Sequence, residues 1–98
     1  YVHLLKIDTE GNEYKVLLGA KDYLLNNRIQ AIQFEFNEMN VISRTFFKDF
    51  WDLLPNFNFY RLLPGGGLLY IKEYNPVNCE IFAFQNIVAT LKDSKKKF

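Results

Sequence analysis

The first third of the chain places a helical segment between two apolar segments, and this order constrains the fold more than any other feature. Residues 2–8 and 29–36 are short apolar-rich runs in which the side chains alternate with period two, as in β-strands. From about Glu13 to Leu25 the pattern is helical instead, and Glu13 in the first turn complements the helix dipole. The expected buried stripe of this helix is Val16, Leu17, Ala20 and Leu24, and Gly11 permits the sharp corner before it. A strand, a helix and a second strand predict parallel pairing, and therefore an α/β fold.

The rest of the chain predicts one more main helix and further strands. We expect a loop at 37–42 and then a helix that ends at Pro55, with apolar positions Phe47, Phe50, Trp51 and Leu54. After it we expect two strands, 57–63 and 68–74, joined by a turn at 64–67. A loop at 75–78 and a final strand at 80–91 complete the chain pattern. Ser43 or Thr45 is expected to cap the helix. Together these segments predict a mixed sheet of about four or five strands with two main helices.

Composition limits the classes of protein that are possible. The 98 residues suffice for one domain, and 49% hydrophobic residues can build a core. A net charge of +1 gives no sign of a nucleic-acid partner, and no apolar run approaches the ~20 residues that span a bilayer. The single cysteine excludes an internal disulfide and a cysteine-rich metal site.

The chain opens inside a strand and without methionine, which predicts an excerpt from a longer protein. We expect a partial domain over 1–91 and a disordered basic tail over 92–98, because the tail carries four lysines and no periodicity. No export signal is visible, so a cytoplasmic location is expected.

Charged and polar residues cluster where the two parallel strands end. Asp8 and Glu10 follow the first strand, Glu35 and Asn37 close the second, and Lys6 lies on the otherwise apolar first strand. Ligands bind at the carboxyl ends of such strands, where carboxylates can orient a hydroxyl or accept its proton. The alternative is structural: Lys6 and Glu35 neutralise each other, while Asp8 and Glu10 cap the following helix.

Other motifs favour structural roles. Gly65, Gly66 and Gly67 lack the strand–loop–helix context of a phosphate loop, so a hairpin turn is expected. His3 has no second histidine to share a metal with, and Cys79 has no nearby base, which predicts an inert thiol and no metal site. The aromatic residues Phe46, Phe47, Phe50 and Trp51 are expected to pack in the core rather than stack on bases.

Two segments carry a family resemblance. Residues 5–13, LKIDTEGNE, followed by VLLGA at 16–20, resemble the LKIDxEGxExxVLxGA segment of FkbM-type methyltransferases, although Thr9 replaces a more usual aliphatic residue. The strand IQFEF at 32–36 resembles the next strand of that family, which also carries a Glu. The segment QNIVA at 85–89 resembles its last strand.

The resemblance implies a class I S-adenosylmethionine-dependent methyltransferase that O-methylates a small-molecule hydroxyl of a sugar or natural product. Such enzymes have a seven-stranded Rossmann-like sheet with an antiparallel last strand, and this chain would be its C-terminal half, from the fourth strand onward. The cofactor's glycine-rich loop and ribose-binding acid are absent, so the isolated chain is expected to be inactive. Asp8 and Glu10 would be catalytic, and Lys6, Glu35 and Asn37 would line the pocket.

A second interpretation belongs to a different class of function. With half of the cofactor site missing, the chain would be a non-catalytic α/β binding or assembly fragment. Its first strand would then be an exposed apolar edge, and such edges pair with other chains. This interpretation predicts self-association through residues 2–8.

Overall fold

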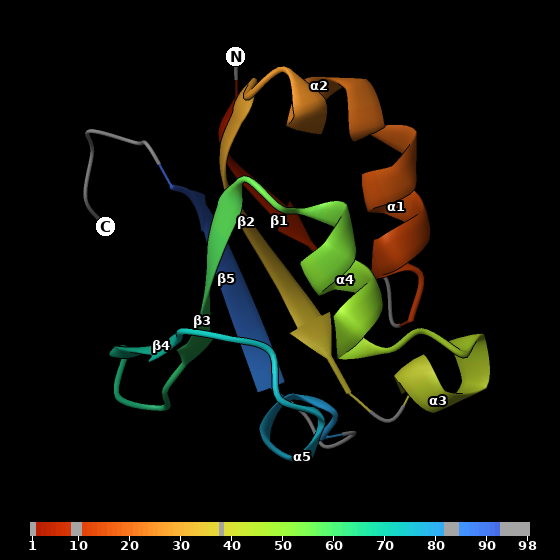
Figure 1. Ribbon diagram of the computed structural model, residues 1–98, viewed down its shortest axis with the longest axis vertical. Helices are drawn as coiled ribbons and strands as arrows, with labels where there is room; N and C mark the ends of the chain where they lie inside the picture. The colour runs from red at the N-terminus through yellow and green to blue at the C-terminus, as the bar shows by residue number, and fades with distance from the viewer. Residues whose placement is uncertain (1, 9–10, 38, 82–84, 93–98) are drawn as a thin grey trace.

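The computed structural model describes residues 2–8, 11–37, 39–81 and 85–92. The elements are β1 (Val2–Ile7), α1 (Glu13–Gly19), α2 (Lys21–Leu25), β2 (Ile29–Phe36), α3 (Met39–Ser43), α4 (Phe47–Leu53), β3 (Phe57–Leu62), β4 (Leu68–Ile71), α5 (Pro76–Cys79) and β5 (Gln85–Leu91). The strands form one mixed sheet in the order β1-β2-β5-β3-β4 (Figure 1). The predicted α/β class and strand number are therefore confirmed.

The pairing of the strands agrees with half of a Rossmann-like sheet. β1 and β2 are parallel, with Lys6 beside Gln33 and Ile7 beside Phe34. β5, the last strand in the sequence, is antiparallel to both of its neighbours, β2 and β3. β4 is an additional strand, joined to β3 by the predicted glycine turn, in which Gly66 has a φ of 90°.

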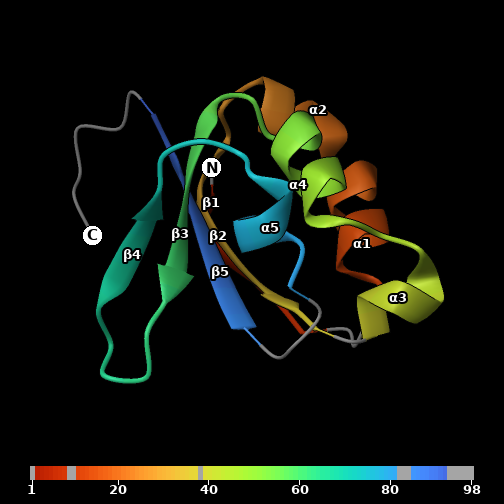
Figure 2. The ribbon, with the colours of Figure 1, turned by 60° about the horizontal axis from the view of Figure 1, so that its bottom comes forward.

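The helices α1, α2 and α4 lie against one face of the sheet (Figure 2). That face carries the buried side chains of the strands, including Ile32, Phe34, Phe59 and Ile87. Phe50 of α4 is fully buried and stacks on Phe34 with ring centroids 4.4 Å apart. None of the described helices covers the opposite face, where the side chains of Leu4 and Tyr70 are about half exposed.

Several boundaries differ from the sequence prediction. The helix expected over 13–25 divides at Ala20 into α1 and α2, directly after Gly19, which has a weak helix propensity. The expected loops at 37–42 and 75–78 contain the short helices α3 and α5. The strand expected over 68–74 ends at Ile71. The final strand, expected over 80–91, is described over Gln85–Leu91; Glu80 and Ile81 are not part of a strand, and residues 82–84 lie outside the described part of the chain. Of the disordered tail predicted over 92–98, residues 93–98 lie outside the described residues, whereas the backbone N–H of Lys92 donates to the carbonyl of Asn56 at 2.9 Å.

Three predictions about side chains of the helices were also wrong. Phe46 is the N-cap of α4, in place of Ser43 or Thr45, and its side chain is 53% exposed rather than in the core. Val16 was expected on the buried stripe of the first helix but is 40% exposed, whereas Leu17 and Leu24 are buried as predicted.

Helix α4 obtains its N-terminal hydrogen bonds from two carboxylates. The backbone N–H of Phe46 donates to Asp49 Oδ2 at 2.7 Å, within the same helix. The next two backbone N–H groups, of Phe47 and Lys48, donate to the two carboxylate oxygens of Glu80 at 2.7 and 2.9 Å. Glu80 follows α5, so one side chain connects the segment around α5 with the helix that covers the sheet.

Candidate functional site

The corner between β1 and α1 is built around Gly11. This residue has a φ of 105°, and a Cβ atom at its position would lie 3.3 Å from Cβ of Met39. Both the backbone conformation and the close approach of α3 therefore favour glycine. The side chain of Glu13, 1% exposed, accepts a hydrogen bond from the Gly11 N–H at 3.0 Å. Gly11 is thus held in place by a buried carboxylate.

The corner after β2 is organised by Asn37, which is 8% exposed. Its Oδ1 accepts a hydrogen bond from the backbone N–H of Met39 at 2.9 Å, which closes an Asx turn. Its Nδ2 donates to Oε2 of Glu35 at 3.4 Å. The Glu35 carboxylate is therefore oriented by the residue that directly follows its strand.

The register of the two strands brings these corners together. Because Ile7 pairs with Phe34, the next residue, Asp8, follows opposite Glu35 at the carboxyl edge of the parallel pair. Neighbouring strands lie about 4.8 Å apart, so the two carboxyl-bearing residues share one edge of the sheet. We refer to Asp8, Glu35 and Asn37 as the rim. The rim residues lie together as the sequence predicted, and their role remains a prediction.

The other two predicted site residues are placed differently. Lys6 is exposed rather than buried, because the face of β1 that carries it has no helix over it. Among the described residues, no carboxylate lies within 4.0 Å of its ammonium group, so the expected pair with Glu35 or Asp8 is not formed. Glu10 lies outside the described residues.

Two buried polar residues beside the rim were not predicted from the sequence. Glu13 was assigned only to the helix dipole, and Asn40 was assigned to a loop. Asn40 is 1% exposed, and its Oδ1 accepts a hydrogen bond from the backbone N–H of Asn37 at 3.0 Å, while its Nδ2 meets no partner among the described residues. The spacing of three between Asn37 and Asn40, typical of capping side chains, was the available signal.

Three further observations concern other kinds of site in the described part of the chain. It contains no group of three or more His, Cys, Asp and Glu side chains that could hold a metal ion. Cys79 is a free thiol with 1% exposure. Among the helices that the structure describes, none has the length and apolar character to cross a bilayer.

The arrangement at the rim can bind and orient a hydroxyl group, because carboxylate and amide oxygens accept its hydrogen bond.

Comparison with known families identifies the family of the chain. The Methyltransferase FkbM domain matches residues 1–62, which run from β1 to the end of β3. The chain belongs to the FkbM methyltransferase family. No curated protein and no solved structure matches the chain. The FkbM match contains the whole rim, whereas β4, α5 and β5 follow it in the sequence.

Proposed function

We propose that this FkbM domain forms the acceptor side of an S-adenosylmethionine-dependent O-methyltransferase that acts on a hydroxyl of a sugar or another natural product. The observation that supports the proposal most directly is the position of Asp8 beside Glu35, at the carboxyl edge of two parallel strands and within the matched segment. This edge is where open α/β sheets bind their ligands.

The roles of the rim residues follow from their positions. Asp8 is exposed, so its carboxylate can reach an acceptor hydroxyl and take up the proton that the hydroxyl loses. Glu35 is half-buried and hydrogen-bonded to Asn37, so its carboxylate is held in place and is suited to orient the acceptor. We further propose that Glu10 contacts the acceptor together with the rim residues. The positive charge of Lys6 would partly offset the negative charge of these carboxylates.

The described residues do not form a complete site for S-adenosylmethionine, the methyl donor that the family implies. Cofactor sites in Rossmann-like folds use a glycine-rich turn that joins a strand to a helix. Here Gly65, Gly66 and Gly67 join two antiparallel strands, β3 and β4, and the corner before α1 offers only Gly11. We therefore limit the proposal to contacts between the described residues and the acceptor.

The direct test is a methyl-transfer assay on the full-length natural protein that carries this sequence. With S-adenosylmethionine labelled in its methyl group, we expect label to enter hydroxyl-bearing saccharides and polyols as an O-methyl ether. Matched amino and deoxy analogues of a working acceptor serve as controls. Label on nitrogen in the amino analogue, or no transfer to any hydroxyl, would contradict the proposal.

A second function, assembly, is favoured by the position of β1 at the end of the sheet. Its outer side has no strand partner in the described part of the chain, and Leu4 within it is 53% exposed. An apolar edge strand of this kind pairs readily with another chain. We therefore propose that the 98-residue chain self-associates through β1.

Sedimentation velocity tests this assembly. We expect a dimer or larger species that dissociates in the variant Leu4→Lys, because a charge on an edge strand opposes pairing. Val77→Lys is the matched control, since Val77 is 83% exposed on α5, outside the sheet. A monomer at high concentration, or an equal effect of both variants, would rule out assembly through β1.

A further inference from the structure

A concave site lies at the same edge of the sheet as the rim, but on the helix-covered face. It is a groove of about 420 Å³ between β4 and the segment around α5, lined by residues that include Arg61, Leu69, Lys72, Asn78 and Ile81. Pockets for small organic molecules occupy about 300–1,000 Å³, so this groove has a suitable size. It lies apart from the rim, because Arg61 pairs with Ile87 on the core face of the sheet, whereas Lys6 and Asp8 belong to the opposite face.

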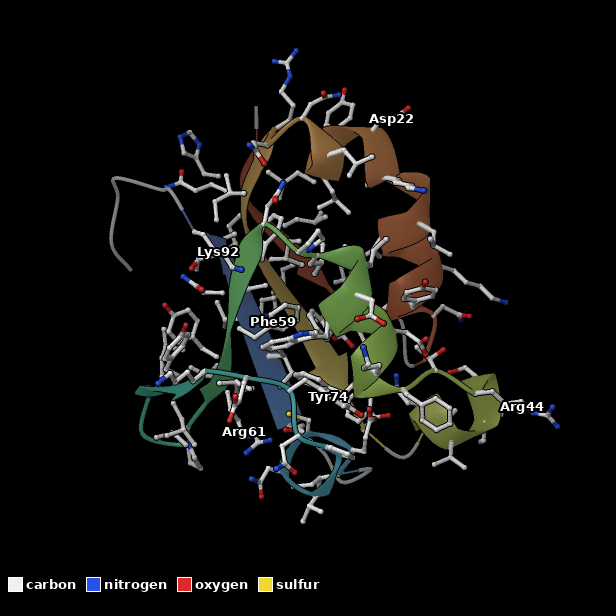
Figure 3. All side chains as sticks on the ribbon, viewed as in Figure 1. Asp22, Arg44, Phe59, Arg61, Tyr74 and Lys92 are labelled. Carbon is white, nitrogen blue, oxygen red and sulfur yellow. The ribbon has the colours of Figure 1, made fainter. Side chains whose placement is uncertain are left out.

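The guanidinium of Arg61 is held in a fixed orientation. Nε donates to Oε1 of Gln85 at 2.6 Å, and Nη2 donates to the backbone carbonyl of Asn78 at 2.9 Å. Gln85 is itself fixed, since its Nε2 donates to the carbonyl of Ile81 at 2.9 Å. Nη1 of Arg61 donates to none of the described residues. Figure 3 shows Arg61 directed from β3 towards α5.

The charge of this guanidinium is not neutralised within the described structure. Both of its hydrogen-bond acceptors are neutral amide oxygens, and no described carboxylate lies within 4.0 Å of it. Lys72 and Glu73 also line the groove and offset each other, so its charged side chains sum to one positive charge. A half-buried, preoriented arginine without a counter-ion is suited to bind a carboxylate.

The wall beside Arg61 is apolar and open to solvent. Leu69 pairs with Arg61 across the β3–β4 hairpin and is 50% exposed, and Ile81 is 42% exposed. A ligand that covers these two side chains removes apolar surface from water, which favours binding at about 25 cal/mol per Å². The groove therefore combines one cationic anchor with an apolar surface.

We propose that this groove binds a small organic carboxylate, with its anionic group on Arg61 and its apolar body against Leu69 and Ile81. The proposal is independent of methyl transfer, since it uses none of the rim residues. Its ligand class is defined by two requirements: a planar anion that matches the arginine fork, and an aromatic or aliphatic group attached to it.

Titration of the 98-residue chain with benzoate, followed by NMR or calorimetry, tests the proposal. We expect saturable binding of benzoate, weaker binding of acetate, which lacks the apolar body, and no binding of benzyl alcohol, which lacks the charge. Arg61→Gln should weaken benzoate binding roughly 10- to 100-fold, because a charge-assisted hydrogen bond is lost. Arg28→Gln, at an exposed arginine that lines no part of the groove, should leave the affinity unchanged.

A second variant keeps the proposal testable if Arg61→Gln does not fold. Leu69→Ser should weaken benzoate several-fold and leave acetate unchanged, because only the apolar contact is removed. The absence of saturable benzoate binding to the native chain would overturn the proposal. Equal losses of benzoate affinity in Arg61→Gln and Arg28→Gln would also overturn it. So would inorganic phosphate that binds as tightly as benzoate and whose affinity is unchanged in Leu69→Ser.

Discussion

Replacement of Asp8 by Asn is expected to lower the turnover number of the natural full-length protein about 100-fold or more, which is the usual contribution of a positioned general base. The substitution keeps the size of the side chain and its hydrogen-bonding ability but removes its capacity to accept a proton. Asp8 is exposed and follows the last paired residue of β1. The free energy of unfolding should therefore change by less than about 0.5 kcal/mol.

The measurement is kcat and KM for methyl transfer to a working acceptor, with unfolding in urea followed in parallel. Asp22→Asn is the matched control, because Asp22 is an exposed aspartate in α2, far from the rim (Figure 3). It should leave kcat unchanged. If Asp8→Asn retains native turnover, or if its loss of activity follows a loss of stability, Asp8 is not the base.

The strand–helix–strand core could be predicted from the sequence because its determinants are local. Alternation of Ile32, Phe34 and Phe36 sets the buried face of β2, and Asn27 ends the preceding helix with a φ of 54°. The positions of Asp8 and Glu35 then followed from parallel pairing alone, since the carboxyl ends of parallel strands share an edge.

The second half of the chain was harder to predict because its contacts are long-range. The order of the strands places β5 between β2 and β3, and nothing in the periodicity of residues 57–91 specifies that insertion. The cap of α4 was assigned to Ser43 or Thr45, which are close in sequence, whereas the structure uses Asp49 within the helix and Glu80, 33 residues from Phe47. A carboxylate that distant has no local signature.

The side chains of the two sites also depend on contacts that are long-range in the sequence. The exposure of Lys6 depends on which sheet face the helices cover, and the two strand patterns alone do not decide this. The orientation of Arg61 depends on Gln85 and Asn78, which belong to different segments of the chain. Residue types at the strand ends were thus predictable, whereas the partners that hold them were not.

Glu80 is the residue with the largest expected effect on stability outside the core. Besides the two backbone N–H groups of α4, its Oε2 accepts a hydrogen bond from the hydroxyl of Tyr74 at 2.5 Å. Tyr74 also lies against the aromatic side chain of Trp51, with ring centroids 6.3 Å apart. One carboxylate thus joins α4, α5 and the segment that leaves β4.

Glu80→Ala is expected to lower the free energy of unfolding by about 2–3 kcal/mol, because a helix cap and a charge-assisted hydrogen bond are lost together. Tyr74→Phe removes only the phenol hydrogen bond and should cost about 1 kcal/mol. Glu73→Gln is the matched control, since Glu73 is an exposed carboxylate on the neighbouring segment. Urea unfolding of the three variants measures the differences, and a cost of Glu80→Ala no larger than that of Glu73→Gln would contradict the capping role.

The same cluster predicts a dependence of stability on alkaline pH. Burial, together with the hydrogen bond to Glu80 and the charge of its carboxylate, raises the pKa of Tyr74 from its usual 10.0 to about 12. Because the folded state holds the phenol proton more tightly, the stabilisation is complete below pH 10 and is lost as the pH rises towards 12. In Tyr74→Phe this loss should disappear. Glu80→Gln should shift the tyrosinate absorbance transition to lower pH, and an unshifted transition would show that the carboxylate does not act on Tyr74.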